Sequence, residues 1–286
     1  MSPVALGALI IGAILVPGLA AGLVLRRLDI RQDQRTGKAL RALQPATPGR
    51  FDPAMLADLP EVAQRYFRRA LAPGTPLAQG VALRMEGRFI LNGTALPMRA
   101  EQVLIPPARG FVWRARFGEG AMRISGSDGM LCPDDGPVQS WTRFWLMGVL
   151  PVARVGGTAD HARSAATRAM MEAVWAPATL LPQAGAVWQQ TGPDGATVRF
   201  PALDGISPLE LRLNPDGTLA EIRAMRWSDA NAGHLYRLQP FGGRVLESAT
   251  FNGFTIPAAV EMGNQWGTDA YAPFFIARIT EARHPA

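Results

Sequence analysis

The sequence predicts an α+β protein that is mainly β, with an N-terminal transmembrane helix followed by a curved, half-barrel-like antiparallel sheet that two or so helices cover. Two observations predict this class. No side chain is charged from Pro3 to Leu25, and six basic side chains follow from Arg26 to Arg41. Beyond residue 80, apolar and polar residues alternate in short segments separated by Asn-Gly, Asp-Gly and Gly-Gly pairs, a pattern typical of antiparallel hairpins. The spacing of these segments leaves little room for the helices that parallel strands require.

We interpret residues 1–25 as a transmembrane anchor that is not cleaved. The 23 residues from Pro3 to Leu25 form a helix about 34 Å long if fully helical, enough for a hydrocarbon core of about 30 Å. The alternative is a secretory signal peptide, which has basic residues before a shorter apolar segment and a cleavage site of small residues. Only Ala20 to Gly22 resemble such a site, and the apolar segment continues beyond them.

Residues 26–57 are predicted to form a basic juxtamembrane segment and a proline-rich linker. Basic residues after a span favour the cytoplasmic side for the chain that follows. We therefore expect a single-pass protein of the inner (cytoplasmic) membrane, with one β-rich domain, residues 58–286, in the cytoplasm. An export route would place that domain in the periplasm instead. Membrane lipid is the expected partner of the anchor and of the basic segment.

The predicted domain carries almost no net charge. The first 50 residues hold seven of the 29 basic and two of the 23 acidic side chains, which leaves 22 and 21 for the rest. A domain that binds nucleic acid needs a basic face, so we expect no nucleic-acid partner. Cys132 is the only cysteine, and no two of the three histidines are four residues apart. The sequence therefore predicts no disulfide, no metal site and no other cofactor.

Two helices are predicted within the domain. The first begins near Asp58, a good N-cap residue, with Pro60 in its first turn and apolar residues at helical spacing from Val62 to Leu71. The second runs from Asp160 to Val174, carries an alanine-rich apolar stripe and begins at a cap residue, Thr158 or Asp160. Both stripes need an apolar partner, which one face of the sheet supplies.

The strand predictions rest on alternation and on turns. Between residues 111 and 117, aromatic residues and alanine occupy one face while Val112, Arg114 and Arg116 occupy the other. Asn92-Gly93 predicts the first hairpin, and Gly242-Gly243 is expected to be another turn. The segment from Trp141 to Val155 is expected to be a buried connection, a lid or a membrane-touching loop. Its aromatic part is assigned to core packing, with a pocket lid or a membrane-touching loop as alternatives.

Catalytic motifs are incomplete. A nucleophile elbow has glycine where this chain has Ser125, so Ser127 is expected in a turn and not in a catalytic role. Asp160 and His161 at a helix start are interpreted as a cap and its neighbour, and His284 is expected to be frayed at the terminus.

Short motifs are spread along the predicted domain. They are Leu59-Pro60 with Arg65-Tyr66, Gly87 and Phe89, Ala100 and Gln102, Phe111-x-Trp113-x-Ala115-Arg116, Glu172 with Trp175 and Pro177, Thr179 to Pro182, Trp188, Gly242-Gly243, Ile256-Pro257 and Trp266. Together they resemble a bacterial family of uncharacterised proteins, a domain of unknown function. The resemblance covers roughly residues 58–280 without 130–159. It implies a membrane segment but no reaction, substrate or catalytic residue.

The predicted architecture is also similar, in shape only, to the half-barrel lipoprotein carriers of bacterial envelopes. Those proteins wrap a sheet around helices and bind acyl chains between them. A similarity of fold is a weak argument for function, because unrelated activities share folds.

The ligand-binding candidates are Arg65, Tyr66, Trp113, Arg116, Glu172 and Trp175. Glu172 and Trp175 are neighbours on a helix because they are three residues apart. Glu172 either pairs with a sheet arginine (Arg114, Arg116 or Arg226) to fix the helix, or provides the polar anchor of a ligand cavity. No catalytic or metal-binding residue is predicted.

We favour a membrane-anchored protein that binds an apolar ligand, a lipid or acyl chain, between sheet and helices. A membrane-associated hydrolase and a structural or assembly protein docking on a membrane partner are the alternatives, and the sequence leaves open whether the chain is an enzyme. A void between sheet and helices would favour ligand binding, whereas a filled interior would favour a scaffold.

Overall fold

The computed structural model describes residues 3–44 and 49–285, with side chains from Val16 onward. Within these residues, 13 strands form one sheet in the order β6-β5-β4-β3-β2-β1-β13-β12-β11-β10-β9-β8-β7. Neighbours in this order pair antiparallel, and β1 pairs with β13 so that the two halves of the chain make one continuous surface. The predicted meander is therefore confirmed.

The strands of the first half are β1 (Val81–Leu91), β2 (Thr94–Ile105), β3 (Gly110–Phe117), β4 (Ile124–Leu131), β5 (Gln139–Leu146) and β6 (Leu150–Gly156). Those of the second half are β7 (Val187–Gln190), β8 (Gly195–Arg199), β9 (Leu209–Leu213), β10 (Leu219–Ser228), β11 (Arg237–Phe251), β12 (Phe254–Asn264) and β13 (Ala272–Arg283). Asn92 and Gly93 turn the chain between β1 and β2, as predicted, and both have positive φ (49° and 78°), which a two-residue hairpin turn requires.

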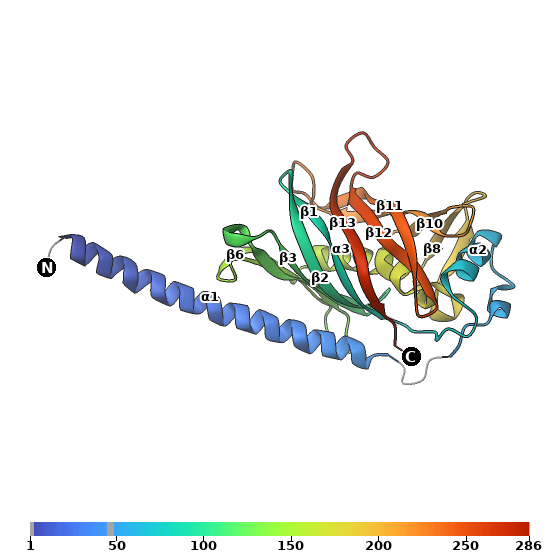
Figure 1. Cartoon of the computed structure of the whole chain (residues 1–286), viewed down its shortest axis with the longest axis horizontal. Coiled ribbons are helices and arrows are strands. Elements are labelled where there is room, and N and C mark those ends of the chain that lie inside the picture. The colour runs from blue at the N-terminus through green and yellow to red at the C-terminus, as the bar shows by residue number, and fades with distance from the viewer. Residues whose placement is uncertain (1–2, 45–48, 286) are drawn as a thin grey trace.

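The face of the sheet that the first half turns toward helix α3 is called the inner face here. Helix α3 (Ala159–Met171) lies against it, and the sheet curves around the helix (Figure 1). Thr158 caps α3 by accepting a hydrogen bond from the backbone N–H of His161. Three 3-10 turns extend the helix along the inner face: Glu172–Trp175, Pro177–Leu180 and Pro182–Ala184.

Alternation within β3 divides residues between the two faces as the sequence predicts. Phe111, Trp113 and Phe117 are buried in the main core, whereas Arg114 and Arg116 are exposed on the opposite, outer face. Period-two patterning therefore supplies both an apolar inner surface and a charged outer one.

A long helix occupies part of the outer face. Helix α1 (Pro3–Ala42) runs beside β2, β3, β4 and β6 and continues beyond the sheet toward its N-terminus (Figure 1). Residues 26–42, predicted to be a juxtamembrane segment and linker, are thus part of this helix, and Asp29, Asp33 and Leu40 are buried against the sheet. Residues 45–48 of the predicted linker lie outside the described residues.

The predicted membrane anchor is tested only in part. Among the helices and side chains that the structure describes, none provides a stretch long and apolar enough to cross a bilayer. The side chains of residues 1–15, which carry most of the predicted anchor 1–25, lie outside the described residues.

Helix α2 (Glu61–Ala70) covers the other end of the sheet, where it packs against β7, β8 and β12. A single 3-10 turn, Pro53–Leu56, precedes it. Asp58 was expected to be the N-cap, but Pro60 occupies that position and no side chain caps the helix. The apolar stripe from Val62 to Ala70 is buried, as the spacing predicts.

Two local predictions are wrong. Gly242 and Gly243 lie inside β11 and not in a turn, because the neighbouring strands approach too closely for a side chain: a Cβ on Gly243 would lie 1.8 Å from the carbonyl oxygen of Glu261. The segment 141–155, expected to be a connection, a lid or a loop, forms strands β5 and β6 instead. Trp141 and Trp145 within it are buried, as the core-packing interpretation requires.

Candidate functional site

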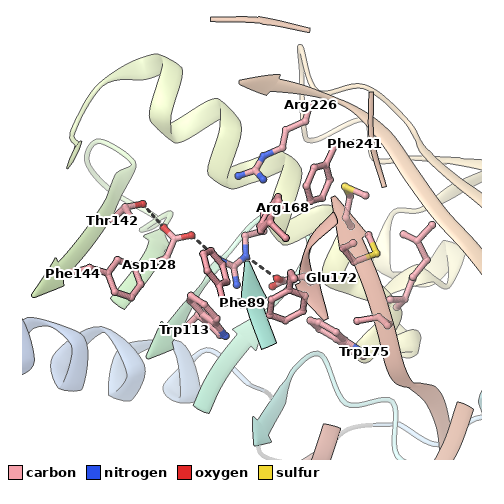
Figure 2. Close-up of a pocket in the computed structure, with 17 residues that line it drawn as sticks. Phe89, Trp113, Asp128, Thr142, Phe144, Arg168, Glu172, Trp175, Arg226 and Phe241 are labelled. Carbon is pink, nitrogen blue, oxygen red and sulfur yellow. Dashed lines mark hydrogen bonds and ion pairs between the residues drawn. The ribbon is translucent and has the colours of Figure 1, made fainter. Parts of the chain in front are cut away.

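A cavity of about 230 Å³ lies between the inner face and α3 (Figure 2). Most of its wall is aromatic or aliphatic. The apolar residues are Phe89, Trp113, Phe144, Met171, Val174, Trp175, Ile222, Phe241, Val260, Met262, Phe274 and Phe275. They come from both halves of the sheet and from the α3 region, so the cavity exists only because the curved sheet brings these elements together.

One part of the wall is charged. Arg168 on α3 forms ion pairs with Asp128 on β4 and with Glu172, at 2.5 and 2.7 Å between nitrogen and oxygen. Gln102 on β2 donates a hydrogen bond of 2.5 Å to the second oxygen of Glu172, and Thr142 donates one of 2.8 Å to Asp128. The helix is therefore fixed to β4 and β2 by one buried arginine and its two carboxylates.

The charged groups around Arg168 favour its protonated form. Burial lowers the pKa of Arg168, but the charges of Glu172 and Asp128, together with their hydrogen bonds, outweigh burial and raise that pKa above its ordinary value. The guanidinium also lies over the rings of Phe111 and Trp113, at 4.5 and 5.0 Å from their centroids. Arg168 is thus a fixed cation in the wall.

A second arginine, Arg226 on β10, also lines the cavity and extends toward α3 (Figure 2). Its Nε donates a hydrogen bond of 3.1 Å to Ser164, and its guanidinium lies 5.0 Å from the ring centroid of Phe241. Burial and the nearby charge of Arg168 lower the pKa of Arg226. Within the described residues, no carboxylate forms an ion pair with it.

A hydrogen-bonded histidine lies behind this wall. His161 Nδ1 is 2.9 Å from Ser140 Oγ, and its Nε2 is 3.1 Å from Thr142 Oγ1. Burial lowers the pKa of His161, which favours the neutral ring. Neither Ser140 nor His161 lines the cavity, so this chain of hydrogen bonds joins α3 to β5. No group of three metal-ligating side chains occurs in the part of the chain that the structure describes.

The structure brings three of the six predicted ligand-binding residues to the cavity: Trp113, Glu172 and Trp175. The partner of Glu172 is not one of the sheet arginines 114, 116 and 226 but Arg168, one turn earlier on its own helix. The Nε1 of Trp175 donates a hydrogen bond of 3.0 Å to the carbonyl oxygen of Pro257, and the Nε1 of Trp113 is buried with no partner among the described residues.

The other three predicted residues lie elsewhere. Arg65 pairs with Asp194 at 2.6 Å, and Tyr66 packs against Phe67 and Trp188, so both attach α2 to the far end of the sheet. Burial raises the pKa of Tyr66 well above its usual range.

Arg116 is on the outer face. With Arg26 of α1 and Arg99, it lines a groove of about 520 Å³ between the helix and the sheet, on the side of the sheet opposite the cavity. Arg99 and Arg116 are directly opposite each other on neighbouring strands.

Sequence reasoning missed Arg168 and Asp128, and it named Arg226 only as one of three possible ion-pair partners of Glu172. The four-residue spacing from Arg168 to Glu172 was a usable signal, because such pairs face each other on a helix. Asp128 was read only as part of a serine motif, and nothing local distinguishes Arg226 from other strand arginines.

Two further expectations are corrected by the structure. Ser127 lies in strand β4 and not in a turn; its buried hydroxyl donates to Asp33 of α1 and accepts from Trp141 Nε1. His284 is not frayed: its ring stacks on Phe254 with centroids 3.7 Å apart, and its Nε2 lies 2.8 Å from the carbonyl oxygen of Trp175.

The sequence matches a family of unknown function, DUF6544, over residues 49–276. The chain belongs to this family. The match confirms the predicted resemblance and spans residues 130–159, which the resemblance did not cover. It begins after α1 and ends within β13, so it covers α2, α3 and the sheet up to the start of that strand. Among curated proteins, none matches the chain.

Three solved structures are similar to this chain at 9–11% sequence identity. A putative outer membrane lipoprotein-sorting protein domain from Vibrio parahaemolyticus has a TM-score of 0.41, with 9% identity, 78% of this chain and 91% of that chain covered. A LolA superfamily protein from Nitrosomonas europaea has a TM-score of 0.39, with 9% identity, 79% and 92% covered. A DUF1329 family protein from Desulfovibrio piger has a TM-score of 0.36, with 11% identity, 82% and 94% covered.

Proposed function

We propose that this protein binds one apolar molecule, a lipid or a single acyl chain, between the inner face of its sheet and α3. The observation that carries the proposal is the cavity of about 230 Å³ with an aromatic wall and one charged side. An apolar cavity of about 150 Å³ is already large enough for benzene, and small-molecule sites combine an apolar lining with a few convergent polar groups.

We also propose that residues 1–25 anchor the protein in a membrane. The described part of α1 adds support, because Leu19, Leu23 and Val24 are exposed on it. Contact with the sheet extends to Gly22, where a Cβ would come within 2.7 Å of the carbonyl oxygen of Val149 in the β5–β6 turn. This proximity puts the sheet directly beside the end of the proposed anchor.

The β5–β6 hairpin adds to this surface. Its exposed apolar side chains are Met147, Leu150, Val152 and Val155. Apolar side chains beside the end of a span suit the water–lipid boundary, so the hairpin would rest on the bilayer that supplies the ligand. The basic residues that follow the span favour the cytoplasmic side for the sheet, with the periplasm as the alternative.

Site-mapped photocrosslinking tests the binding. The full chain in lipid nanodiscs is exposed to a long-chain alcohol that carries a photoreactive diazirine, and the labelled peptides are identified by mass spectrometry. We expect labelling of the inner-face strands β12 and β13, whose residues Val260, Met262 and Phe274 line the cavity.

The variant Val260→Phe fills the cavity and should reduce that labelling at least about fivefold, because a larger ring occupies the space of the chain. Val187→Phe makes the same change at an exposed position of β7 and should leave it unaltered. Labelling confined to α1 and the β5–β6 hairpin in the unaltered protein would contradict ligand binding, and circular dichroism checks that both variants fold.

A further inference from the structure

Arg226 is the charged group of the cavity that forms no ion pair within the described residues. In the part of the chain that the structure describes, its Nε donates a hydrogen bond to Ser164 and its guanidinium lies over the face of Phe241, and neither partner carries a negative charge. Its side chain is only partly buried, and it lines the cavity. A guanidinium presents five N–H donors in a planar fork, so most of the donors of Arg226 are free to bind a ligand.

The carboxylates of the cavity are already committed to another cation. Arg168 holds Asp128 and Glu172 at 2.5 and 2.7 Å, and Thr142 and Gln102 supply further hydrogen bonds to the same two carboxylates. These two carboxylates and Arg168 form a hydrogen-bonded group with one more negative than positive charge, and the group lies close enough for its charges to act on Arg226 (Figure 2). Arg226 balances this charge from a distance, but neither carboxylate engages its guanidinium donors, which can therefore bind a ligand.

The size of the cavity limits the ligand to one chain. Drug-sized ligands occupy sites of about 300–1,000 Å³. At about 230 Å³, the cavity is smaller than this range and is too small to enclose a lipid with two or three acyl chains. The aromatic wall from Phe89 to Phe275 suits a hydrocarbon chain, while the charged wall suits one polar end.

We propose that the ligand is a single-chain amphiphile with an anionic head group, a carboxylate or a phosphate monoester, whose head group is bound by Arg226 while its chain lies along the aromatic wall. This inference rests on the proposed function, because it assigns the polar end of the same ligand. A guanidinium recognises both anions through paired, charge-assisted hydrogen bonds.

Three photoreactive probes with the same diazirine-bearing chain separate the possibilities: a fatty acid, an alkyl phosphate and the long-chain alcohol. They are titrated into nanodiscs with the full chain, at a pH where both acids are ionised, and labelling of the peptides from β12 and β13 gives the half-saturating mole fraction. We expect one or both anionic probes to saturate at a mole fraction at least about tenfold lower than the alcohol, since hydrogen bonds to charged groups are worth about 1.5–3 kcal/mol.

Arg226→Gln should remove this preference, and circular dichroism checks that the variant folds. Arg226→Lys should keep part of the preference. The matched control is Arg223→Gln, on the same strand, where the arginine is exposed and paired with Glu210 at 2.7 Å. That variant should keep the full preference.

Equal saturation by all three probes, or an anion preference that survives in Arg226→Gln, would overturn the inference while ligand binding stands. Absence of cavity labelling by all three probes would overturn ligand binding and the inference together. The fatty acid and the alkyl phosphate distinguish which anion the site prefers.

Discussion

The two faces of the sheet bury charge in opposite arrangements. On the inner face one cation, Arg168, lies between two carboxylates, Asp128 and Glu172. On the outer face one carboxylate, Asp29 of α1, lies between two arginines, Arg143 and Arg154 at 3.4 and 2.6 Å. Both clusters fix a helix to strands, yet only the inner one borders a cavity.

In the outer cluster, the central carboxylate of Asp29 has both oxygens engaged in hydrogen bonds. Asp29 accepts hydrogen bonds from both arginines and from the Nε1 of Trp145 at 3.0 Å, so both of its oxygens are occupied. The inner cluster has Arg226 beside it, with donors that no carboxylate in the described chain engages. The comparison teaches that charged groups whose hydrogen-bonding capacity is used within the protein serve attachment, whereas unengaged donors beside a cavity are available to a ligand.

The largest effect is expected from removing the central cation of the inner face. Arg168→Met leaves Asp128 and Glu172 without their partner in a desolvated place, and we expect a loss of about 3–5 kcal/mol in the free energy of unfolding. Chemical denaturation of the full chain, followed by tryptophan fluorescence, measures it.

Two variants sharpen this result. Combining Arg168→Met with Asp128→Asn and Glu172→Gln should restore most of the stability, because no uncompensated charge is left. Arg163→Met on the same helix removes an arginine that contacts Trp227 and the Gly205 carbonyl oxygen at the surface, and should cost less than about 1 kcal/mol. If Arg163→Met destabilised as much as Arg168→Met, burial of the ion pairs would not be the cause.

A smaller effect is expected at the C-terminal end of the inner side, where His284 stacks on Phe254. Burial lowers the pKa of His284 from 6.5 to about 4, although its hydrogen bond to the Trp175 carbonyl opposes the shift. Between these values the unfolded chain binds more protons, so stability rises with pH and falls as the pH drops from 6.5 toward 4. The loss is at most about 3 kcal/mol.

Unfolding curves at a series of pH values measure this dependence. His284→Phe keeps a ring for the stack and removes the titration, so the difference between the two proteins isolates the contribution of His284. The variant should flatten the curve between pH 4 and 6.5. An unchanged pH dependence would show that His284 is not buried as a neutral ring.

The sequence predicted those features that depend on local pattern. Asn92-Gly93 and the alternation through β3 determine a turn and two faces within a few residues, and both are confirmed. The glycine pair at Gly242 has the composition of a turn but lies within β11, because its role depends on the approach of strands β10 and β12. Such contacts between distant strands leave no local signal.

The site shows the same division. Trp113, Glu172 and Trp175 could be selected because aromatic and acidic residues on an apolar helix or strand suggest a polar anchor in a cavity. Their connection to Arg226 could not, since β10 follows α3 by some 50 residues and reaches the cavity only through the curvature of the sheet. Likewise, the sequence shows Asp29 only as an acidic residue in a basic segment. Its burial between two arginines follows from the contact of α1 with β5 and β6, which the sequence does not reveal.

The smallest effect, and the one that tests the outer face, is expected for Asp29→Asn. The variant leaves Arg143 and Arg154 without their carboxylate, but Arg154 is 37% exposed and can turn to water, so we expect a loss of only about 2 kcal/mol. Hydrogen exchange should be faster along residues 26–42 of α1 and unchanged in α3. The control Glu101→Gln removes an exposed carboxylate that pairs with Arg84 and Arg114 on the same face, and should leave the exchange of α1 unaltered. Equal protection of α1 in wild type and Asp29→Asn would mean that apolar contacts such as Leu40, and not the buried charge, hold the helix to the sheet.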